Sequence, residues 1–284
     1  MKPDQAVGKD ANLKRPRLWV RAGGVIMAST VKIPKKTQDR IVASLRRYQN
    51  IVGKLRARDI SEADTVTVIK DMLSDLFGYD KYTELTSEQQ IRGTFCDLAV
   101  KVEEKIYYLA EVKAAGINLN DNHLRQAVNY GAHQGIEWII LTNAIEWRIY
   151  RIKFGQPIDY EEVFSFDVCG LSARSQDDLA QLYLLCRESI SSDALTEFHK
   201  QAQILNRFVA AEILQCDAII AALRREFRRI FDGIKVSEEE LKALVVSEVL
   251  KREVVDGDPA KQAKALVKKA GAAFAKRKAA ATAA

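Results

Sequence analysis

The sequence predicts a mixed α/β domain followed by a helical region. Apolar residues recur at a helical period of about 3.6 between positions 61 and 77, then change to a β-rich pattern between 94 and 113. A helical segment at 121–134 and two short strand-like segments follow, and every periodic segment after residue 176 is helical. Strands interleaved with helices predict a central mixed sheet flanked by helices, with an α-helical C-terminal region.

Two helices are expected before the first strand. The first begins near Thr37 and has a basic surface; its apolar stripe contains Ile41, Leu45, Tyr48, Ile51 and Leu55. The second is signalled by Ser61, which precedes Asp64 by three residues as in an N-terminal capping box, and Gly78 ends its apolar stripe.

The strand pattern starts with an expected hairpin. Residues 94–102 and 106–113 are its two strands, and a loop over 103–105 joins them. After the helix over 121–134, short strands are expected at 138–142 and 147–152. Further helices are expected over the ranges 176–187, 195–231 and 238–252.

Four units follow from these patterns. Residues 1–36 form a basic segment that we expect to be disordered, with Met27 as an alternative translation start. Residues 37–168 form the α/β domain, including its leading basic helix. Residues 169–256 form a helical region, and 257–284 a flexible tail rich in Lys and Ala.

The charge of the chain is unevenly distributed. The formal net charge of the 284 residues is +6, but residues 1–60 carry +11 and residues 261–284 carry +7, which leaves −12 for the centre. Basic ends around an acidic centre fit a carboxylate-rich site that approaches a polyanion. They equally fit solvated ends that keep the protein soluble.

Composition excludes several classes of protein. With 14 Gly, 5 Pro and 4 Cys, the chain is neither collagen-like nor a disulfide scaffold, and no phosphate-loop motif indicates an ATP-driven motor. The cysteines are widely spaced, as expected of reduced thiols in a cytoplasmic protein. No apolar run approaches the roughly 18 residues that a membrane span needs.

The chemistry is expected at Asp97, Glu111 and Lys113. Alternate residues of a strand share a face, so Glu111 and Lys113 project together, and the hairpin places Asp97 directly opposite Glu111. Two facing carboxylates repel each other unless a cation bridges them, and oxygen ligands favour Mg²⁺ or Mn²⁺. The ammonium of Lys113 could then orient a water or stabilise a phosphate. An exposed Glu–Lys pair on an edge strand is the alternative.

These residues belong to an ordered set of motifs. The set comprises Asp97 followed after thirteen residues by Glu111-Val112-Lys113, then Gln126-x-x-x-Tyr130, Leu141-Thr142-Asn143 and Trp147-Arg148-Ile149-Tyr150, with Glu62 upstream. It resembles the N-terminal nuclease domain of type I restriction enzyme R subunits, within the PD-(D/E)xK nuclease superfamily. The resemblance covers roughly residues 55–155. It lacks the Pro of the superfamily name, because Cys96 precedes Asp97, and the helicase motor of a complete R subunit is absent from this sequence.

The resemblance implies a restriction-endonuclease-like core and assigns roles to residues. Asp97 and Glu111 would hold Mg²⁺ with the carbonyl of Val112, Glu62 would support the metal, and Lys113 would assist the attacking water. Gln126 and Tyr130, four residues apart on one helix face, would position the strand or a DNA phosphate. Packing of Tyr130 on the sheet is the alternative.

Weaker DNA-binding candidates lie in the helical region and the tail. Four arginines form two adjacent pairs one helical turn apart and could contact phosphates; they are Arg224, Arg225, Arg228 and Arg229. The Lys-rich segment from Lys261 to Lys278 could attract DNA without reading its sequence. A solvated helix face and a solubilising end are the respective alternatives.

The expected function is metal-dependent hydrolysis of DNA, related to type I restriction and defence against foreign DNA. DNA is the expected partner, and modification, specificity or helicase subunits would act in trans if the chain works in such a system. The alternatives are a non-catalytic DNA-binding or assembly module of the same fold, a repair-type exonuclease and an RNA nuclease.

Overall fold

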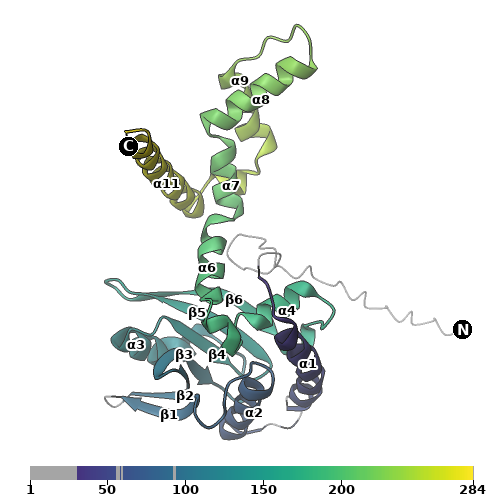
Figure 1. Cartoon of the computed structure of the whole chain (residues 1–284), viewed down its shortest axis with the longest axis vertical. Coiled ribbons are helices and arrows are strands. Elements are labelled where there is room, and N and C mark those ends of the chain that lie inside the picture. The colour runs from purple at the N-terminus through teal and green to yellow at the C-terminus, as the bar shows by residue number, and fades with distance from the viewer. Residues whose placement is uncertain (1–30, 56–57, 59, 92–93, 284) are drawn as a thin grey trace, which may run out of the picture.

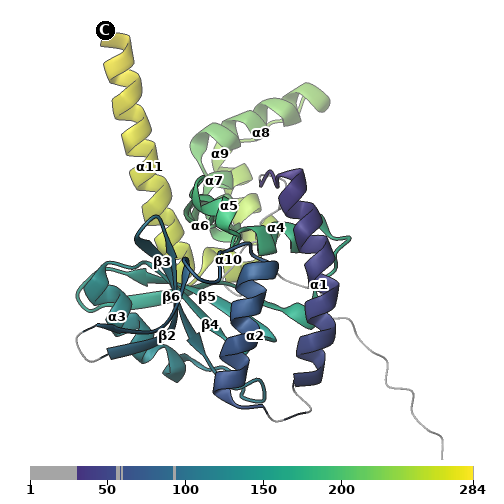
Figure 2. The same ribbon diagram turned by 60° about the horizontal axis from the view of Figure 1, so that its bottom comes forward.

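The computed structural model describes residues 31–55, 58, 60–91 and 94–283. A six-stranded sheet with helices on both faces forms the body of the molecule, and a helical arm extends from it (Figures 1 and 2). This arrangement confirms the predicted mixed α/β class. The segment 1–30, including Met27, lies outside the described residues.

The sheet follows the chain order from β1 to β6. All neighbouring strands pair antiparallel except β3 and β4, which are parallel. The parallel pair is connected through α3, as a parallel connection requires. The strands are β1 (Leu85–Ile91), β2 (Thr94–Val102), β3 (Lys105–Val112), β4 (Trp138–Thr142), β5 (Glu146–Lys153) and β6 (Asp159–Asp167).

Helices precede, interrupt and follow the sheet. Those of the domain are α1 (Lys35–Leu55), α2 (Glu62–Asp75), η2 (Asp121–Leu124), α3 (Arg125–Gln134), η3 (Val168–Gly170), α4 (Gln176–Tyr183) and α5 (Arg187–Ile190). Those that follow are α6 (Ala194–Ile204), α7 (Arg207–Leu214), α8 (Asp217–Ile230), α9 (Glu238–Leu244), η4 (Val245–Val249), α10 (Arg252–Val255) and α11 (Asp258–Ala283). No helix in the described part of the chain is both long enough and apolar enough to cross a membrane.

The two faces of the sheet are covered differently. One face packs against α1, α2 and α4 in the largest core cluster, which includes Ile41, Met72, Val112, Trp147 and Leu182. The other face is covered by α3, whose Ala127 and Tyr130 pack on strand residues. Because side chains alternate along a strand, Ala99 and Leu109 under α3 place Asp97 and Glu111 on the same face as α3.

Two strands, β1 and β6, were not predicted from the sequence. The edge strands β1 and β6 contain polar stretches, Thr86–Gln90 and Asp159–Glu162, that weaken an alternating apolar pattern. Both strands pair along their lengths with one neighbour. Pairing with the sheet therefore overrides the weak local signal, as is common at edges.

The helical region is more broken than predicted, and the tail is more ordered in secondary structure. The single helix expected over 195–231 is three helices, because Asn206 caps α7 through bonds to the amides of Phe208 and Val209. The segment 257–284, which we expected to be a flexible tail, contains the helix α11, which packs against α7. Ala and Lys are strong helix formers, and packing stabilises a helix beyond propensity.

The β2–β3 hairpin has the predicted register at the site, although its loop is one residue shorter than predicted. Its loop has two residues, Glu103 and Glu104, both with positive φ as in a type I′ turn, rather than three. The shorter loop shifts the pairing by one residue, and an irregularity between Val100 and Lys101 shifts it back. Leu98 consequently pairs with Ala110, so Asp97 and Glu111 follow that pair as predicted.

One guanidinium joins α1, the end of α2 and α5. Arg40 makes a bidentate ion pair with Glu188, at 2.5 and 2.8 Å, and donates to the carbonyls of Leu76 and Phe77 at 3.3 and 3.1 Å. It lies so close to Gly78 that a Cβ there would be 2.5 Å from the guanidinium carbon. Gly78 also has φ of +88°, so both space and backbone conformation require glycine.

We expect Arg40→Ala to lower the free energy of unfolding by about 2 kcal/mol, because it leaves two carbonyls and a half-buried carboxylate without their donor. Arg47→Ala is the matched control, since the ion pair of Arg47 with Asp75 is more exposed and should contribute less than about 1 kcal/mol. Urea unfolding of both variants measures the difference. Equal effects would contradict a special role for Arg40.

Candidate active site

Asp97 and Glu111 lie together near one end of the two central strands β2 and β3. Asp97 is half-buried, and its Oδ2 accepts a 2.7 Å hydrogen bond from the backbone amide of Val112. Glu111 is buried, with 6% of its surface exposed. The bond to Val112 fixes the Asp97 carboxylate against the strand that carries Glu111, so the sheet holds both acids in place.

Lys113 connects the predicted site residues. Its Nζ lies 2.8 Å from Oε1 of Glu111 and 2.8 Å from the carbonyl oxygen of Val112. The same Nζ lies 3.5 Å from Oε2 of Glu62. Oxygens of three predicted metal-site residues, Glu111, Val112 and Glu62, thus lie around one cationic atom. The backbone amide of Lys113 bonds to the carbonyl of Thr142 at the end of β4.

Glu62 reaches the site because α2 begins there. Ser61 caps α2 as predicted: its hydroxyl accepts from the amide of Asp64 and donates to the Asp64 carboxylate. Glu62 is the first residue of the helix, where the helix dipole favours a carboxylate. Its ion pair with Lys113 joins residues 51 positions apart, a proximity that only the tertiary structure creates.

The site carries more negative than positive charge. Burial raises the pKa of Glu111, and the carboxylates of Asp97 and Glu62 raise it further, against the opposing hydrogen bond from Lys113. Burial alone would lower the pKa of Lys113, but the bond to Glu111 and the charges of all three acids outweigh it and raise that pKa. Three acids around one ammonium therefore leave an excess of negative charge at the site.

The donors present fit a hard divalent cation better than zinc. Carboxylate and carbonyl oxygens are what Mg²⁺ and Mn²⁺ prefer, whereas zinc prefers His and Cys. The one cysteine close to the acids, Cys96, is buried, and burial raises the pKa of its thiol to about 12. No group of three or more His, Cys, Asp or Glu side chains in the described residues forms a ready metal cage, so water or substrate oxygens would have to complete the coordination.

Gln126 and Tyr130, four residues apart on α3, differ in their surroundings. Gln126 is exposed on α3, whereas Tyr130 is buried among Cys96, Ala99, Leu109 and Ile136. Its hydroxyl has no hydrogen-bond partner among the described residues. Tyr130 therefore packs on the sheet, which is the alternative that the sequence left open, and its phenol does not face a DNA phosphate in this conformation.

The predicted arginine stripe lies on the arm, away from the acids. Figure 1 shows α8 toward the far end of the arm. Arg224 donates to the carbonyl of Val236 and pairs with Glu238, and Arg229 pairs with Glu226. Arg225 and Arg228 are exposed and make no ion pair within the described part of the chain. Half of the predicted stripe is thus engaged within the arm.

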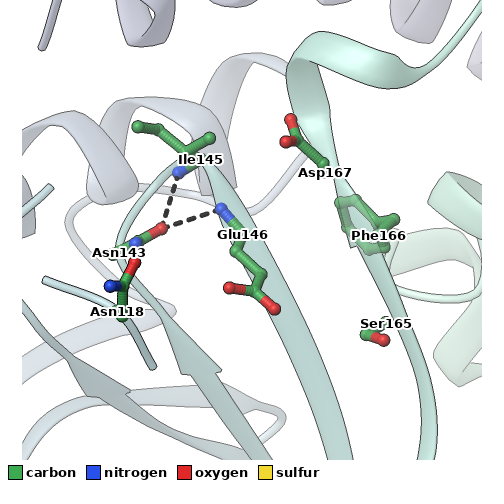
Figure 3. A pocket seen from close by; sticks show the side chains of 7 residues that line it. All are labelled: Asn118, Asn143, Ile145, Glu146, Ser165, Phe166 and Asp167. Atoms are coloured by element: carbon green, nitrogen blue, oxygen red, sulfur yellow. Dashed lines mark hydrogen bonds between the residues drawn. The ribbon is translucent and has the colours of Figure 1, made fainter. Parts of the chain in front are cut away.

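A polar cavity of about 280 Å³ lies beside the turn between β4 and β5. Its lining includes Asn143, Glu146, Ser165 and Asp167 but none of the predicted site residues. Figure 3 shows Asn143 at its wall, with Oδ1 accepting from the amides of Ile145 and Glu146 at 3.1 and 2.8 Å.

Asn143 also holds the segment that follows Lys113. Its Nδ2 donates a 2.9 Å hydrogen bond to the carbonyl of Ile117, while Oδ1 organises the β4–β5 turn, in which Ala144 has positive φ. One side chain thus ties two loops together next to the strand end that carries Lys113. This role of Asn143 was not predicted from the sequence, although an Asn inside a tight turn was the available signal.

Comparison with known proteins identifies one relationship. Residues 68–165, about a third of the chain, match the family described as type I restriction enzyme R protein N terminus. The matched segment contains Asp97, Glu111, Lys113 and the β4–β5 turn, and it confirms the resemblance inferred from the motifs. No curated protein and no solved structure matches the chain significantly.

Replacing Asn143 by Asp should loosen the loop after Lys113. The carboxylate keeps the acceptor for Ile145 and Glu146 but removes the donor to Ile117, which is worth about 1 kcal/mol of local stability. Amide hydrogen exchange of residues 114–119 should therefore accelerate several-fold. Asn118→Asp, the same chemical change at an exposed position of the loop, should leave exchange unchanged, and acceleration in both variants would contradict the assigned bond.

Glu111→Gln should change how stability depends on pH. A carboxyl group whose pKa is raised by folding holds its proton more tightly in the folded state, so the wild type loses stability as pH rises through and above the ordinary Glu range. The variant lacks this loss. Urea unfolding in EDTA between pH 4 and 8 should show that the free energy of unfolding of the variant increases relative to that of the wild type as pH rises. A constant difference between the two proteins would contradict the raised pKa.

Proposed function

With residues 68–165 as a type I restriction enzyme R protein N-terminal segment, we propose that this protein hydrolyses DNA phosphodiester bonds with Mg²⁺ or Mn²⁺ as part of a restriction system. The observation that carries the proposal is the convergence of Glu111 and the Val112 carbonyl on one cationic atom, beside the fixed carboxylate of Asp97. An exposed structural ion pair would not require a buried acid with a raised pKa.

Asp97, Glu111 and the carbonyl of Val112 would hold the metal, and Glu62 would support it from the start of α2. A bound divalent cation neutralises phosphate charge and lowers the pKa of a coordinated water. The excess of acids over bases around Lys113 supports this assignment, because a divalent cation offsets their mutual repulsion.

The protein's own groups have separate tasks in this proposal. The Val112 amide orients Asp97, and the sheet keeps Glu111 beside it without rearrangement. Lys113 keeps its proton, since the surrounding acids raise its pKa, and its ammonium can donate to a phosphate oxygen or to the attacking water. Asn143 holds the loop behind Lys113, which limits the movement of that strand end.

DNA is the proposed substrate because of the family match. The side chains of the site address a phosphate and carry no base recognition, so the choice of sequence would come from elsewhere. Modification, specificity and helicase subunits acting in trans would supply recognition and ATP use, as proposed partners of this chain.

The experiment is cleavage of plasmid, linear duplex, single-stranded DNA and RNA in Mg²⁺, Mn²⁺ or EDTA. We expect metal-dependent cleavage of DNA that falls by about 100-fold or more in Asp97→Ala and Lys113→Ala, since each removes a group that contacts the reacting phosphate or its metal. Lys105→Ala, at the opposite end of β3, is the matched control and should cleave like the wild type.

Metal binding separates a nuclease from a non-catalytic module. Mg²⁺ should raise the melting temperature of the wild type by mass action and should fail to do so in Glu111→Ala. Equal cleavage by the wild type, Asp97→Ala and Lys113→Ala would defeat the proposal. Metal-dependent cleavage of RNA alone would instead identify an RNA nuclease.

A further inference from the structure

The helix α11 presents a face of lysines that the proposed active site does not use. Between Pro259 and the end of the chain there are seven Lys and Arg residues and no Asp or Glu. The helix packs against α7, and Figure 2 shows it projecting beyond the other elements. The basic side chains of the C-terminal segment are therefore held on a helix, at fixed positions relative to one another.

The lysines are arranged along one side of α11. At 3.6 residues per turn, five of them fall within an arc of about 140°, and we call these five the lysine stripe: Lys261, Lys264, Lys268, Lys269 and Lys276. Lys261 pairs with Asp258, whereas the other four are exposed and have no ion pair among the described residues. Ala263, which is buried, lies on the opposite side of the helix.

We propose that the lysine stripe binds the phosphate backbone of duplex DNA and so gives this protein a second contact with the substrate. This inference rests on the proposed nuclease function for the choice of polyanion. An ammonium acts as a point charge toward phosphate and needs no shaped pocket. Such contacts give affinity without sequence recognition, which suits a site that reads no bases.

The dimensions of the stripe suit a duplex. From Lys261 to Lys276 the helix advances about 22 Å at 1.5 Å per residue, and duplex DNA carries about one charge per 1.7 Å. About a dozen phosphate charges lie along that length, so several lysines can each face a different phosphate. A small anion would engage only one or two of them.

A protein partner fits the stripe poorly. The residues that lie between the lysines on this face are small, Ala265, Ala272 and Ala275. Protein interfaces have an apolar core enriched in aromatic residues and are depleted of Lys. The face therefore lacks the anchor residues that a second copy of this chain, or another protein, would bury.

A membrane surface fits it poorly too. An interfacial helix needs a continuous face of large apolar residues beside its lysines. On the side of α11 opposite the lysines, Ala263 and Val267 are buried and half-buried where the helix is packed. The exposed large apolar side chains of the described part of α11 are Leu266 and Phe274. Two such residues, two turns apart, do not form a continuous apolar face along a 26-residue helix.

The test replaces the four unpaired lysines together. Lys264, Lys268, Lys269 and Lys276 become Gln, which keeps helix propensity and removes four charges. The matched control carries Lys32→Gln, Lys36→Gln, Lys54→Gln and Lys105→Gln, four exposed positions in the α/β domain or just before it. Binding of a fluorescent 30-base-pair duplex is measured in EDTA, where no metal-dependent cleavage occurs, over a range of salt concentrations.

The stripe variant should bind more weakly, and the slope of log K against log salt should become shallower by about 3 to 4, near 0.9 for each lost phosphate contact. The control should keep a slope within about one of the wild type. An unchanged slope in the stripe variant, or an equal loss in both variants, would overturn the inference.

Two further measurements exclude the other occupants. Binding of the wild type to vesicles of phosphatidylserine and phosphatidylcholine, with loss in the stripe variant but no change in DNA binding, would overturn the inference in favour of a membrane. Dissociation of a wild-type oligomer by the same substitutions, without an effect on DNA, would overturn it in favour of a second copy.

The inference and the nuclease proposal can fail independently. At saturating protein, the stripe variant should cleave DNA in Mg²⁺ at the wild-type rate, because the acids around Lys113 are untouched. If the stripe variant cleaves DNA normally and binds it with unchanged affinity, DNA binding by the lysine stripe is rejected and the nuclease proposal is retained. Loss of cleavage in Asp97→Ala without loss of DNA binding would support the nuclease proposal and would not contradict DNA binding by the lysine stripe.

Discussion

The pairing of β2 with β3 is the constraint on which the rest of the site depends. It brings Asp97 beside Glu111 on the face that α3 covers, and two acids in that position repel each other. Proteins avoid such an arrangement unless a cation compensates it. Here the compensation is partial: Lys113 bonds to Glu111 and Val112. Burial, with the charge of Asp97, still raises the pKa of Glu111, and the bond to Glu111 and the charges of the acids raise the pKa of Lys113. This repulsion supports the proposal that a divalent metal binds between the two acids.

The position of α2 is the second condition, because this helix delivers Glu62. Its first turn is set by the Ser61 cap, and Arg40 holds the chain directly after its last residue through the carbonyls of Leu76 and Phe77. Arg40 in turn pairs with Glu188 of α5, beyond the sheet in sequence. The helix that carries Glu62 is thus held by α1, which precedes the sheet in the chain, and by α5, which follows it.

Charge is separated in the molecule as it is along the chain. Acids gather where the central strands end, and lysines lie along α11, on an arm that extends from the sheet (Figure 1). In the proposed function a carboxylate site must approach a polyanion, and basic surfaces outside the site can provide that attraction without neutralising the acids within it. The lysine stripe on α11 is the surface proposed for this role, whereas Arg224 and Arg229 pair with acids of the arm.

The sequence by itself determined the local features. The change of apolar period located four of the six strands, Ser61 marked the start of α2, and Asp97 and the Glu111–Lys113 pair pointed to a carboxylate site because their spacing is a property of adjacent strands. Features that depend on distant neighbours were decided by the tertiary structure. The polar edge strands β1 and β6 form because they can pair with the sheet. Glu62 meets Lys113 because the start of α2 lies next to the end of β3. Tyr130 is buried because α3 packs on β2 and β3. The α11 helix gains a packed side from α7. Local periodicity records which face of an element is apolar, but which partner that face or a polar edge will meet depends on contacts between residues far apart in the chain.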